Sequence, residues 1–329
     1  MEAHGHQSRE HLLPITQLLP GETLSLGRYR FIFKVLSPLT LPVYSGGVLR
    51  GIWGNALRQI TCITGKSECS GCMYGPECVY TRVFEPHTLP RLGEGLMSMK
   101  NIPVPYLVEP PPWGSTDYQV GEELVIDMVI MGKALQDLPV IILAWQRALL
   151  QGVGHQRDGK AELIAVSLEL PSQSVERNHP DFARPQLTIP DIQVKERVAL
   201  NFRTPLRIEQ DKVPLWEKHL TAPLLVTSIL RRISLILNAH MNLDLKVDLR
   251  AIIAAAGELE QQKKMVWKEW ERYSARQQRA MTIGGVSGRW ELRGNLDLLV
   301  GYLYLGQWLH AGKETSFGMG LYTLEGVDS

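Results

Sequence analysis

The sequence predicts an α+β protein in which one small unit occurs twice. In each half an apolar helix-like run leads into a loop of glycine and basic residues, and that loop leads into a short strand. These segments are residues 138–150, 151–160 and 163–170 in the first half, and residues 296–309, 311–320 and 321–324 in the second. Each half also opens with a strand, a Pro-Leu turn and a helix. A duplicated β-α-β-β-α-β unit explains both agreements.

The elements of the first half follow from local patterns. Residues 29–36 alternate and are rich in β-forming side chains, which predicts a strand. Prolines end that strand, and Gly46-Gly47 opens a helix expected over residues 48–62. A further strand is expected at residues 122–131, ahead of the helix and closing strand given above.

The second half repeats this order with an insertion. We expect a strand at residues 198–202 and a long apolar helix at 215–239. Residues 244–276 are expected to insert a pair of helices, and residues 280–293 to form two short strands around their glycines. The whole chain then reads as tandem ferredoxin-like domains, similar to RNA-recognition motifs, with helices covering one face of each antiparallel sheet.

Residues 171–190 are rich in Pro, Ser and Asn, which indicates a domain boundary. We expect a flexible leader (1–21), a first domain (22–175) with a cysteine insertion at 62–78, a linker (176–192) and a second domain (193–329). The second domain carries the helical insertion at about 244–276 and the glycine-rich loop at 311–320.

Composition is that of a globular protein, with 44% hydrophobic and 21% charged residues. The net charge is only +1, so any nucleic acid must be held by a local basic patch. The most apolar stretch, residues 220–237, is broken by Arg231 and Arg232, and the first ten residues are polar. We therefore expect a cytoplasmic protein that has no membrane partner.

Four cysteines fall within seventeen positions, spaced C-x6-C-x2-C-x5-C: Cys62, Cys69, Cys72 and Cys78. In a chain without an export signal, such clustering favours metal ligands over disulfides. Four thiolates complete the tetrahedral shell of Zn²⁺ and leave no open position, which predicts a structural zinc. A reduced cluster without metal and an iron–sulfur cluster are the alternatives.

Six segments in order resemble one known family. They are residues 44–51, 78–86, 105–110, 203–207, 284–288 and 309–320. Together they are similar to the CRISPR-associated endoribonucleases that process precursor CRISPR RNA, a family of the RAMP superfamily. The resemblance runs from about Tyr29 to the end of the chain.

This resemblance implies metal-independent cleavage of CRISPR repeat RNA. The ribose 2′-OH attacks the adjacent phosphorus, the 5′-oxygen leaves, and guide crRNA is produced. The implied partners are repeat RNA, its crRNA product and other subunits of a CRISPR effector complex. Two alternatives remain open: a non-catalytic crRNA-binding subunit of such a complex, and an interaction scaffold organised by zinc.

Related enzymes often carry a catalytic histidine in the first helix, but residues 48–61 contain none, and Asn55 stands near its expected place. The best remaining candidate for acid–base catalysis is His310, which follows an apolar helix. A helix C-terminus raises the pKa of a histidine, although such a residue can also simply cap the last carbonyls. Lys313 is the candidate clamp on the scissile phosphate. Tyr44 is a candidate hydrogen-bond partner of the reacting oxygens, or a structural tyrosine.

Further residues are predicted to bind RNA because they are cationic or allow main-chain amides to approach phosphate. They are Arg50, Arg58, His155, Arg157, Lys160, Arg203, Arg207, Arg289, Gly312, Gly318 and Gly320. Near residue 270, the aromatic side chains Trp267, Trp270 and Tyr273 are interleaved with basic ones. This pattern suits either stacking on single-stranded RNA or a packing stripe.

Overall fold

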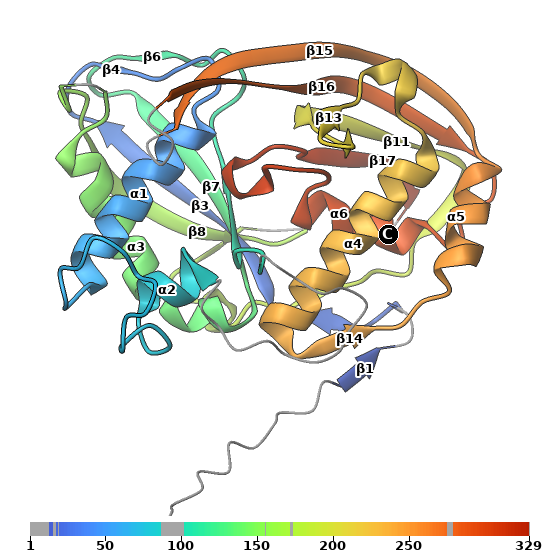
Figure 1. Cartoon of the computed structure of the whole chain (residues 1–329), viewed down its shortest axis with the longest axis horizontal. Coiled ribbons are helices and arrows are strands. Elements are labelled where there is room, and N and C mark those ends of the chain that lie inside the picture. Colours follow the sequence, from blue (N-terminus) through green and yellow to red (C-terminus); the bar gives the residue numbers. More distant parts are fainter. Residues whose placement is uncertain are drawn as a thin grey trace, which may run out of the picture.

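The computed structural model contains two large antiparallel β-sheets with helices between and beside them (Figure 1). It describes residues 13–15, 18, 20–86, 102–154, 156–171, 174–274 and 279–328. One sheet has five strands in the order β5-β7-β3-β8-β9, and the other has four in the order β15-β16-β11-β17. All neighbouring strands in both sheets are antiparallel.

The first half of the chain forms the five-stranded sheet. Its strands are β3 (Leu26–Val35), β5 (Tyr106–Glu109), β7 (Glu123–Met131), β8 (Ala161–Glu169) and β9 (Ser174–Glu176). Its helices are α1 (Gly46–Thr61), α2 (Val79–Val83) and α3 (Leu138–Gln151), with the 3-10 turn η2 (Gly132–Asp137) before α3. The buried rings of Trp53, Trp145 and Phe31 join α1 and α3 to one face of this sheet.

The second half forms the four-stranded sheet. Its strands are β11 (Gln193–Leu206), β15 (Glu260–Ser274), β16 (Arg279–Arg293) and β17 (Tyr322–Asp328). Its helices are α4 (Ala222–Met241), α5 (Leu249–Gly257) and α6 (Val300–Leu309). Its 3-10 turns are η4 (Glu217–His219) and η5 (Thr315–Phe317), while η3 (Pro180–Phe182) lies between the halves and packs Phe182 into the core of the first.

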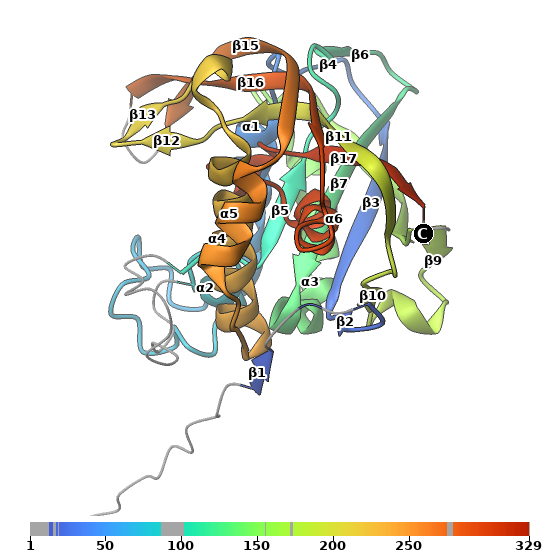
Figure 2. The same ribbon diagram turned by 90° about the vertical axis from the view of Figure 1, so that its right-hand side faces the viewer.

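Four small strand pairs complete the described structure. They are β1 (Leu13–Ile15) with β14 (Leu243–Leu245), β2 (Thr23–Leu24) with β10 (Leu187–Thr188), β4 (Leu39–Thr40) with β6 (Asp117–Tyr118), and β12 (Glu209–Gln210) with β13 (Val213–Pro214). Only the β1–β14 pair is parallel among these. The β12–β13 hairpin lies just before α4 and projects from the body of the protein beneath β15 (Figure 2).

The two halves share one topology. In each, the main strands and helices follow one another as β-α-β-β-α-β, and the four principal strands have the spatial order 2-3-1-4 when numbered along the chain. This mixed architecture of antiparallel sheets is consistent with the ferredoxin-like fold expected from the sequence. The observed α1, β7, α3 and β8 lie within two residues of their predicted bounds, because their periodic patterns are local.

The expected helix pair at residues 244–276 is wrong. The structure has one short helix, α5, and then the long strand β15. Met265 is buried while its neighbour Val266 is 61% exposed, so burial alternates with the period of a strand. The expected break between two strands at residues 280–293 is also wrong, because β16 pairs with β15 along its whole length despite its glycines.

One hydrophobic core joins the two halves. It contains the buried face of α4 and most of α6, and it also contains Leu107 of β5 and Val129 of β7 from the first half. Helix α6 is buried on nearly all sides, as its almost uniformly apolar sequence requires. The far face of the first sheet is therefore covered by helices of the second half, near the end of β5.

Helix α4 is long and apolar enough to span a membrane by length and composition, and it is the one such helix in the part of the chain that the structure describes. Its apolar side chains Leu225, Ile229, Ile233 and Ile236 are buried in the shared core. This burial accounts for the apolar composition of α4 as that of a core helix.

Strands β15 and β16 extend beyond their own half and arch over toward β4 and β6 (Figure 1). At the far end of the arch, Trp270 of β15 packs against Tyr44 and Trp113 of the first half, with ring centroids 4.5 and 5.6 Å apart. Ile283 of β16 is buried in the same small cluster. The arch thus fastens the second half to the first at a point separate from the shared core.

Candidate functional site

The glycine-rich loop after α6 has a conformation that few residues tolerate. His310 and Glu314 adopt positive φ angles of 61° and 59°, and Gly312, Gly318 and Gly320 do the same. A Cβ atom on Gly320 would lie 1.8 Å from the carbonyl oxygen of Ala311. The glycines at these positions allow the loop to fold tightly against the rest of the protein.

The main-chain amides of the three glycines predicted to bind RNA are used within the protein. The N–H groups of Gly312, Gly318 and Gly320 donate to Ser228 Oγ and to the carbonyls of Thr315 and Pro205, at 2.9–3.1 Å. The expectation that these glycines present free N–H groups to phosphate is therefore not met in this structure.

His310 lies at the junction of the two halves and is completely buried. Its Nε2 is 2.8 Å from Oε1 of Glu109 on β5, and its Nδ1 is 3.0 Å from the carbonyl oxygen of Met319. Arg28 of β3 completes the cluster, with its Nε 3.1 Å from each carboxylate oxygen of Glu109. Arg28 also donates to the carbonyl of Gln307 in α6 at 3.0 Å.

Both ring nitrogens of His310 face acceptor oxygens. A carbonyl oxygen can only accept, so Nδ1 carries hydrogen, and a proton must also lie between Nε2 and the carboxyl of Glu109. Burial alone would raise the pKa of Glu109, but Arg28 and His310 hold it below its ordinary value. Burial lowers the pKa of His310, and Glu109 acts in the opposite direction. The cluster is a charged and hydrogen-bonded contact between the halves.

The burial of His310 changes the role that the sequence suggested for it. A histidine with 0% exposure, whose two nitrogens are both engaged, does not reach an RNA strand in this conformation. The expected rise in its pKa at a helix end is also reversed, because burial is the largest effect and lowers the pKa. In this structure His310 is a buried contact between the two halves.

Tyr44 is likewise buried, with 4% of its surface exposed. Its O–H donates to the carbonyl of Phe317 at 2.9 Å, and its ring packs against Trp113 and Trp270. Burial raises the pKa of Tyr44 well above its ordinary value. Tyr44 therefore anchors the glycine-rich loop to the first half, which matches the structural alternative for this residue.

Lys313 is the predicted catalytic residue that reaches solvent, with its side chain 60% exposed. Its main-chain N–H donates to the carbonyl of Arg207 at 2.8 Å. Both cations flank Glu209: Lys313 Nζ is 3.9 Å and Arg207 Nε is 2.8 Å from its carboxylate. The structure thus brings together Lys313 and Arg207, two residues predicted from separate motifs.

Three other predicted RNA-binding arginines are engaged by the protein itself. Arg50 donates to the hydroxyl of Tyr106 at 2.8 Å, Arg58 donates to the carbonyl of Ser67 at 2.7 Å, and Arg289 donates to Glu325 at 2.6 Å. Arg203, Arg157 and Lys160 are exposed, and the last two lie on the loop between α3 and β8. His155 lies outside the described residues.

The four cysteines surround a single hollow of about 300 Å³ between the end of α1 and the start of α2. All four are half-buried free thiols. The N–H of Cys72 donates to the carbonyl of Cys69 at 3.1 Å, which closes the predicted knuckle. Among the described residues, no three His, Cys, Asp or Glu side chains are already arranged as a metal-binding group.

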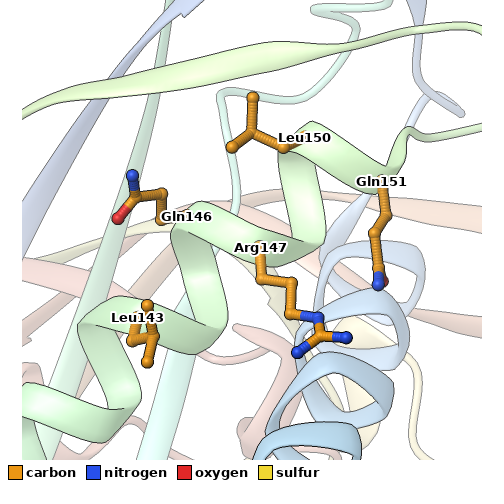
Figure 3. Close-up of a pocket in the computed structure, with 5 residues that line it drawn as sticks. All are labelled: Leu143, Gln146, Arg147, Leu150 and Gln151. Carbon is orange, nitrogen blue, oxygen red and sulfur yellow. The ribbon is translucent and has the colours of Figure 1, made fainter.

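A second hollow, of about 370 Å³, lies on the outer face of α3 and contains none of the predicted site residues (Figure 3). It is lined by Leu143, Gln146, Arg147, Leu150 and Gln151.

Sequence reasoning missed Glu109 and Arg28. The segment around Glu109 was recognised as a family motif, but no local signal marked its carboxylate as the partner of a histidine near the C-terminus.

Two family models each match one part of the chain. Residues 200–322 match the family described as CRISPR-associated endoribonuclease Cas6, and residues 24–186 match a family described as the AF_1859 N-terminal domain. The resemblance of the chain to the Cas6 family is confirmed. The Cas6 match spans β11 to the glycine-rich loop, so it includes both Arg207 and Lys313.

Solved structures show the same fold at low sequence identity. A partial Cas6–RT–Cas1–Cas2 complex matches with a TM-score of 0.58 and 14% identity over 94% of this chain and 47% of that chain. A Cas6 product complex matches with a TM-score of 0.53 and 14% identity over 91% and 99% of the two chains. Cas6 of Thermus thermophilus matches with a TM-score of 0.50 and 15% identity over 92% and 100%.

This chain covers 47% of the matched chain in the partial Cas6–RT–Cas1–Cas2 complex and 29% of the matched chain in a second Cas6–RT–Cas1–Cas2 complex. It therefore spans about half or less of the length of these two proteins. No curated protein matches the chain. The chain thus resembles Cas6 in sequence over residues 200–322 and in fold over most of its length.

Proposed function

We propose that this protein cleaves CRISPR precursor RNA within its repeats to generate guide crRNAs. The observation that carries the proposal is the meeting of Lys313, whose side chain is 60% exposed, with Arg207, whose side chain is 17% exposed, within the segment that matches Cas6. Two cations at one point can hold consecutive phosphates of an RNA strand. Glu209 between them fixes their side chains in place.

The proposed reaction is a transesterification that needs no metal ion. The ribose 2′-oxygen forms a bond to phosphorus as the bond from phosphorus to the 5′-oxygen breaks, which leaves a 2′,3′-cyclic phosphate and a 5′-hydroxyl. The proton lost by the 2′-OH is balanced by the proton gained by the leaving oxygen. Lys313 stabilises the negative charge that develops on the phosphoryl oxygens.

A second candidate is a non-catalytic crRNA-binding subunit of an effector complex. Two specific observations favour it: α1 contains no histidine, and the buried His310 has both nitrogens engaged within the protein. Such a subunit would use the same cations to bind RNA and would leave the strand intact.

One experiment separates the two candidates. The purified protein is incubated with precursor RNA from the CRISPR array of its own genome, in EDTA. Cleavage within each repeat, with 2′,3′-cyclic phosphate on the upstream product, supports the endoribonuclease. Tight binding with intact RNA supports the subunit. The absence of any binding at low salt contradicts both, because phosphate contacts are strongest there.

We also propose that Cys62, Cys69, Cys72 and Cys78 hold a structural Zn²⁺. The four thiols line one hollow, and a knuckle between Cys69 and Cys72 already brings two of them to the same turn. Zinc binds thiolate sulfur at about 2.3 Å, so the ion would draw the thiols inward from the wall of the hollow. The loop has little apolar core of its own, since Ile63 and Met73 are 76% and 81% exposed.

Cellular context follows from the same proposals. A guide-RNA processing enzyme works where the CRISPR array is transcribed, so we propose a cytoplasmic protein whose partners are repeat RNA, crRNA and other CRISPR effector subunits. Neither the proposed RNA contacts nor the zinc site involves a membrane.

A further inference from the structure

Trp216, which directly precedes η4, is a large aromatic side chain held at the surface. Its ring stacks on that of Trp267 in β15, with centroids 4.3 Å apart and an interplanar angle of 18°. Trp216 is nevertheless 53% exposed. Because one face of its ring rests on Trp267, the exposed surface belongs to the opposite face and the edges.

The fold fixes the supporting tryptophan. Trp267 is partly buried against the shared core, and its indole N–H donates to Glu269 at 3.1 Å. A Cβ on Gly284 of β16 would lie 2.5 Å from the Trp267 ring, so the glycine makes room for it. On the other side, Lys263 donates to the carbonyl of Glu217 at 3.1 Å and so holds the segment that follows Trp216. The stacked pair is therefore preorganised.

The tryptophan pair is continuous with the cations of the proposed RNA site. Arg207 Nη1 donates to the carbonyl of Gly284 at 2.9 Å, and the same Gly284 contacts the ring of Trp267. Lys313 is joined to Arg207 through its main chain. A chain of direct contacts thus runs from Lys313 through Arg207 and Gly284 to the two indoles.

The hairpin before Trp216 adds a further exposed cation. Lys212 lies at the tip between β12 and β13, with a positive φ of 66°, and it is exposed. This hairpin projects outward next to β15 (Figure 2). Cations beside an exposed aromatic face are the combination by which proteins bind single-stranded nucleic acid, since phosphates and bases follow one another along the strand.

We propose that the exposed face of Trp216 is a stacking site for an unpaired nucleobase of RNA whose phosphates contact Arg207 and Lys313. The site rests on the proposed function, because it presumes an RNA substrate. A base within a duplex has both faces covered by its neighbours, so the site selects a single-stranded segment. Every base has a π-face, so the site tolerates different sequences.

The test compares two labelled probes of equal length: a uridine 12-mer RNA, and a 12-mer of abasic ribose phosphates. Wild-type protein is expected to bind the uridine 12-mer more tightly than the abasic one. Trp216→Ala is expected to weaken binding of the uridine 12-mer by about 5- to 150-fold, the range for loss of one stacked base, and to leave abasic binding unchanged. Trp216→Phe keeps an aromatic ring, so it should retain most of the difference in affinity between the uridine and abasic 12-mers.

Leu143→Ala on α3 is the matched control, because Leu143 is 49% exposed and lies outside the contact chain from Lys313 to Trp216; it should bind both probes as the wild type does. The proposal is overturned if Trp216→Ala keeps wild-type preference for bases, or if the wild type binds both probes equally well. In either case RNA binding persists and the proposed function stands. If the wild type binds neither probe, nor its own precursor RNA, at low salt, both proposals fall. The wild-type comparison of the two probes does not depend on the folding of any variant.

Discussion

His310 and Glu109 meet across the junction of the two halves, with Nε2 of the imidazole 2.8 Å from Oε1 of the carboxylate. Neither side chain has appreciable solvent exposure, at 0% and 5%. Arg28 contacts the same carboxylate and reaches α6 through the carbonyl of Gln307. The contact fixes the start of the glycine-rich loop relative to β5, so the placement of Lys313 depends on groups buried between the two halves.

The first prediction concerns this buried cluster. Glu109→Ala should lower the free energy of unfolding by about 3–5 kcal/mol, because it leaves Arg28 without its buried counter-charge and His310 without its hydrogen-bond partner. Denaturant titration measures the change. Glu325→Ala removes the exposed partner of Arg289 and should cost less than about 1 kcal/mol. Equal effects of the two substitutions would contradict the importance of the buried contact.

The second prediction concerns pH. Burial lowers the pKa of His240 to about 4, while its Nε2 lies 2.6 Å from the carbonyl of Pro103 and donates to it. In the unfolded chain the imidazole of His240 is protonated as the pH falls below about 6.5, whereas in the folded protein it is protonated only below about pH 4. Stability should therefore fall by about 3 kcal/mol as the pH drops through this window.

His240→Gln keeps an N–H donor for Pro103 and removes the titration. Its free energy of unfolding should change less than that of the wild type between pH 6.5 and 4. The exposed His219, with its substitution His219→Gln, is the control and should leave the wild-type pH dependence intact. If the free energy of unfolding of His240→Gln depended on pH as that of the wild type does, another group would be responsible for the loss of stability in acid.

A third prediction tests the zinc site. Elemental analysis of the protein purified without chelator should find about one zinc per chain. Cys69→Ser should lose that metal and make the segment 62–78 sensitive to limited proteolysis, because the ion holds a loop with little core. Ser67→Ala, which lies beside the cluster and supplies no ligand, should retain metal. Full metal retention in Cys69→Ser would refute the assignment.

The fourth prediction concerns Lys313. Because its side chain is 60% exposed and it meets Arg207, Lys313→Ala should weaken RNA binding and reduce the slope of log affinity against log salt by about 0.7, the value for one phosphate contact on a single strand. Cleavage, if present, should slow as well. Lys160→Ala on the loop after α3 is the comparison. If only Lys160→Ala weakened RNA binding, the phosphate contact would lie in the first half and the prediction for Lys313 would be wrong.

The sequence predicted the elements whose signal is local. The helix periodicity of α3 and the alternation of β8 are contained within each segment, and both lie where expected. The long strand β15 was misread because a run of basic and aromatic residues fits either a helix face or a strand. Its identity is set by pairing with β16, a non-local contact that extends from Glu260 to Ser274.

The candidate site was only partly predictable for the same reason. Lys313 and Arg207 carry recognisable motifs, and the structure brings them together. The burial of His310 depends on Glu109, 201 positions earlier in the chain, and no local pattern links the two. Trp216 likewise gained its role from Trp267, which reaches it through the sheet and not through neighbouring sequence.

Helix α6 has an implication for how the molecule can be divided. The side chains of α6 pack in one hydrophobic core with Leu107 and Val129. A fragment that contained only the first half would therefore expose apolar surface on β5 and β7, and a fragment that contained only the second half would expose α6. Such fragments should aggregate when produced separately. We therefore expect the duplicated units to unfold together, in spite of their repeated topology.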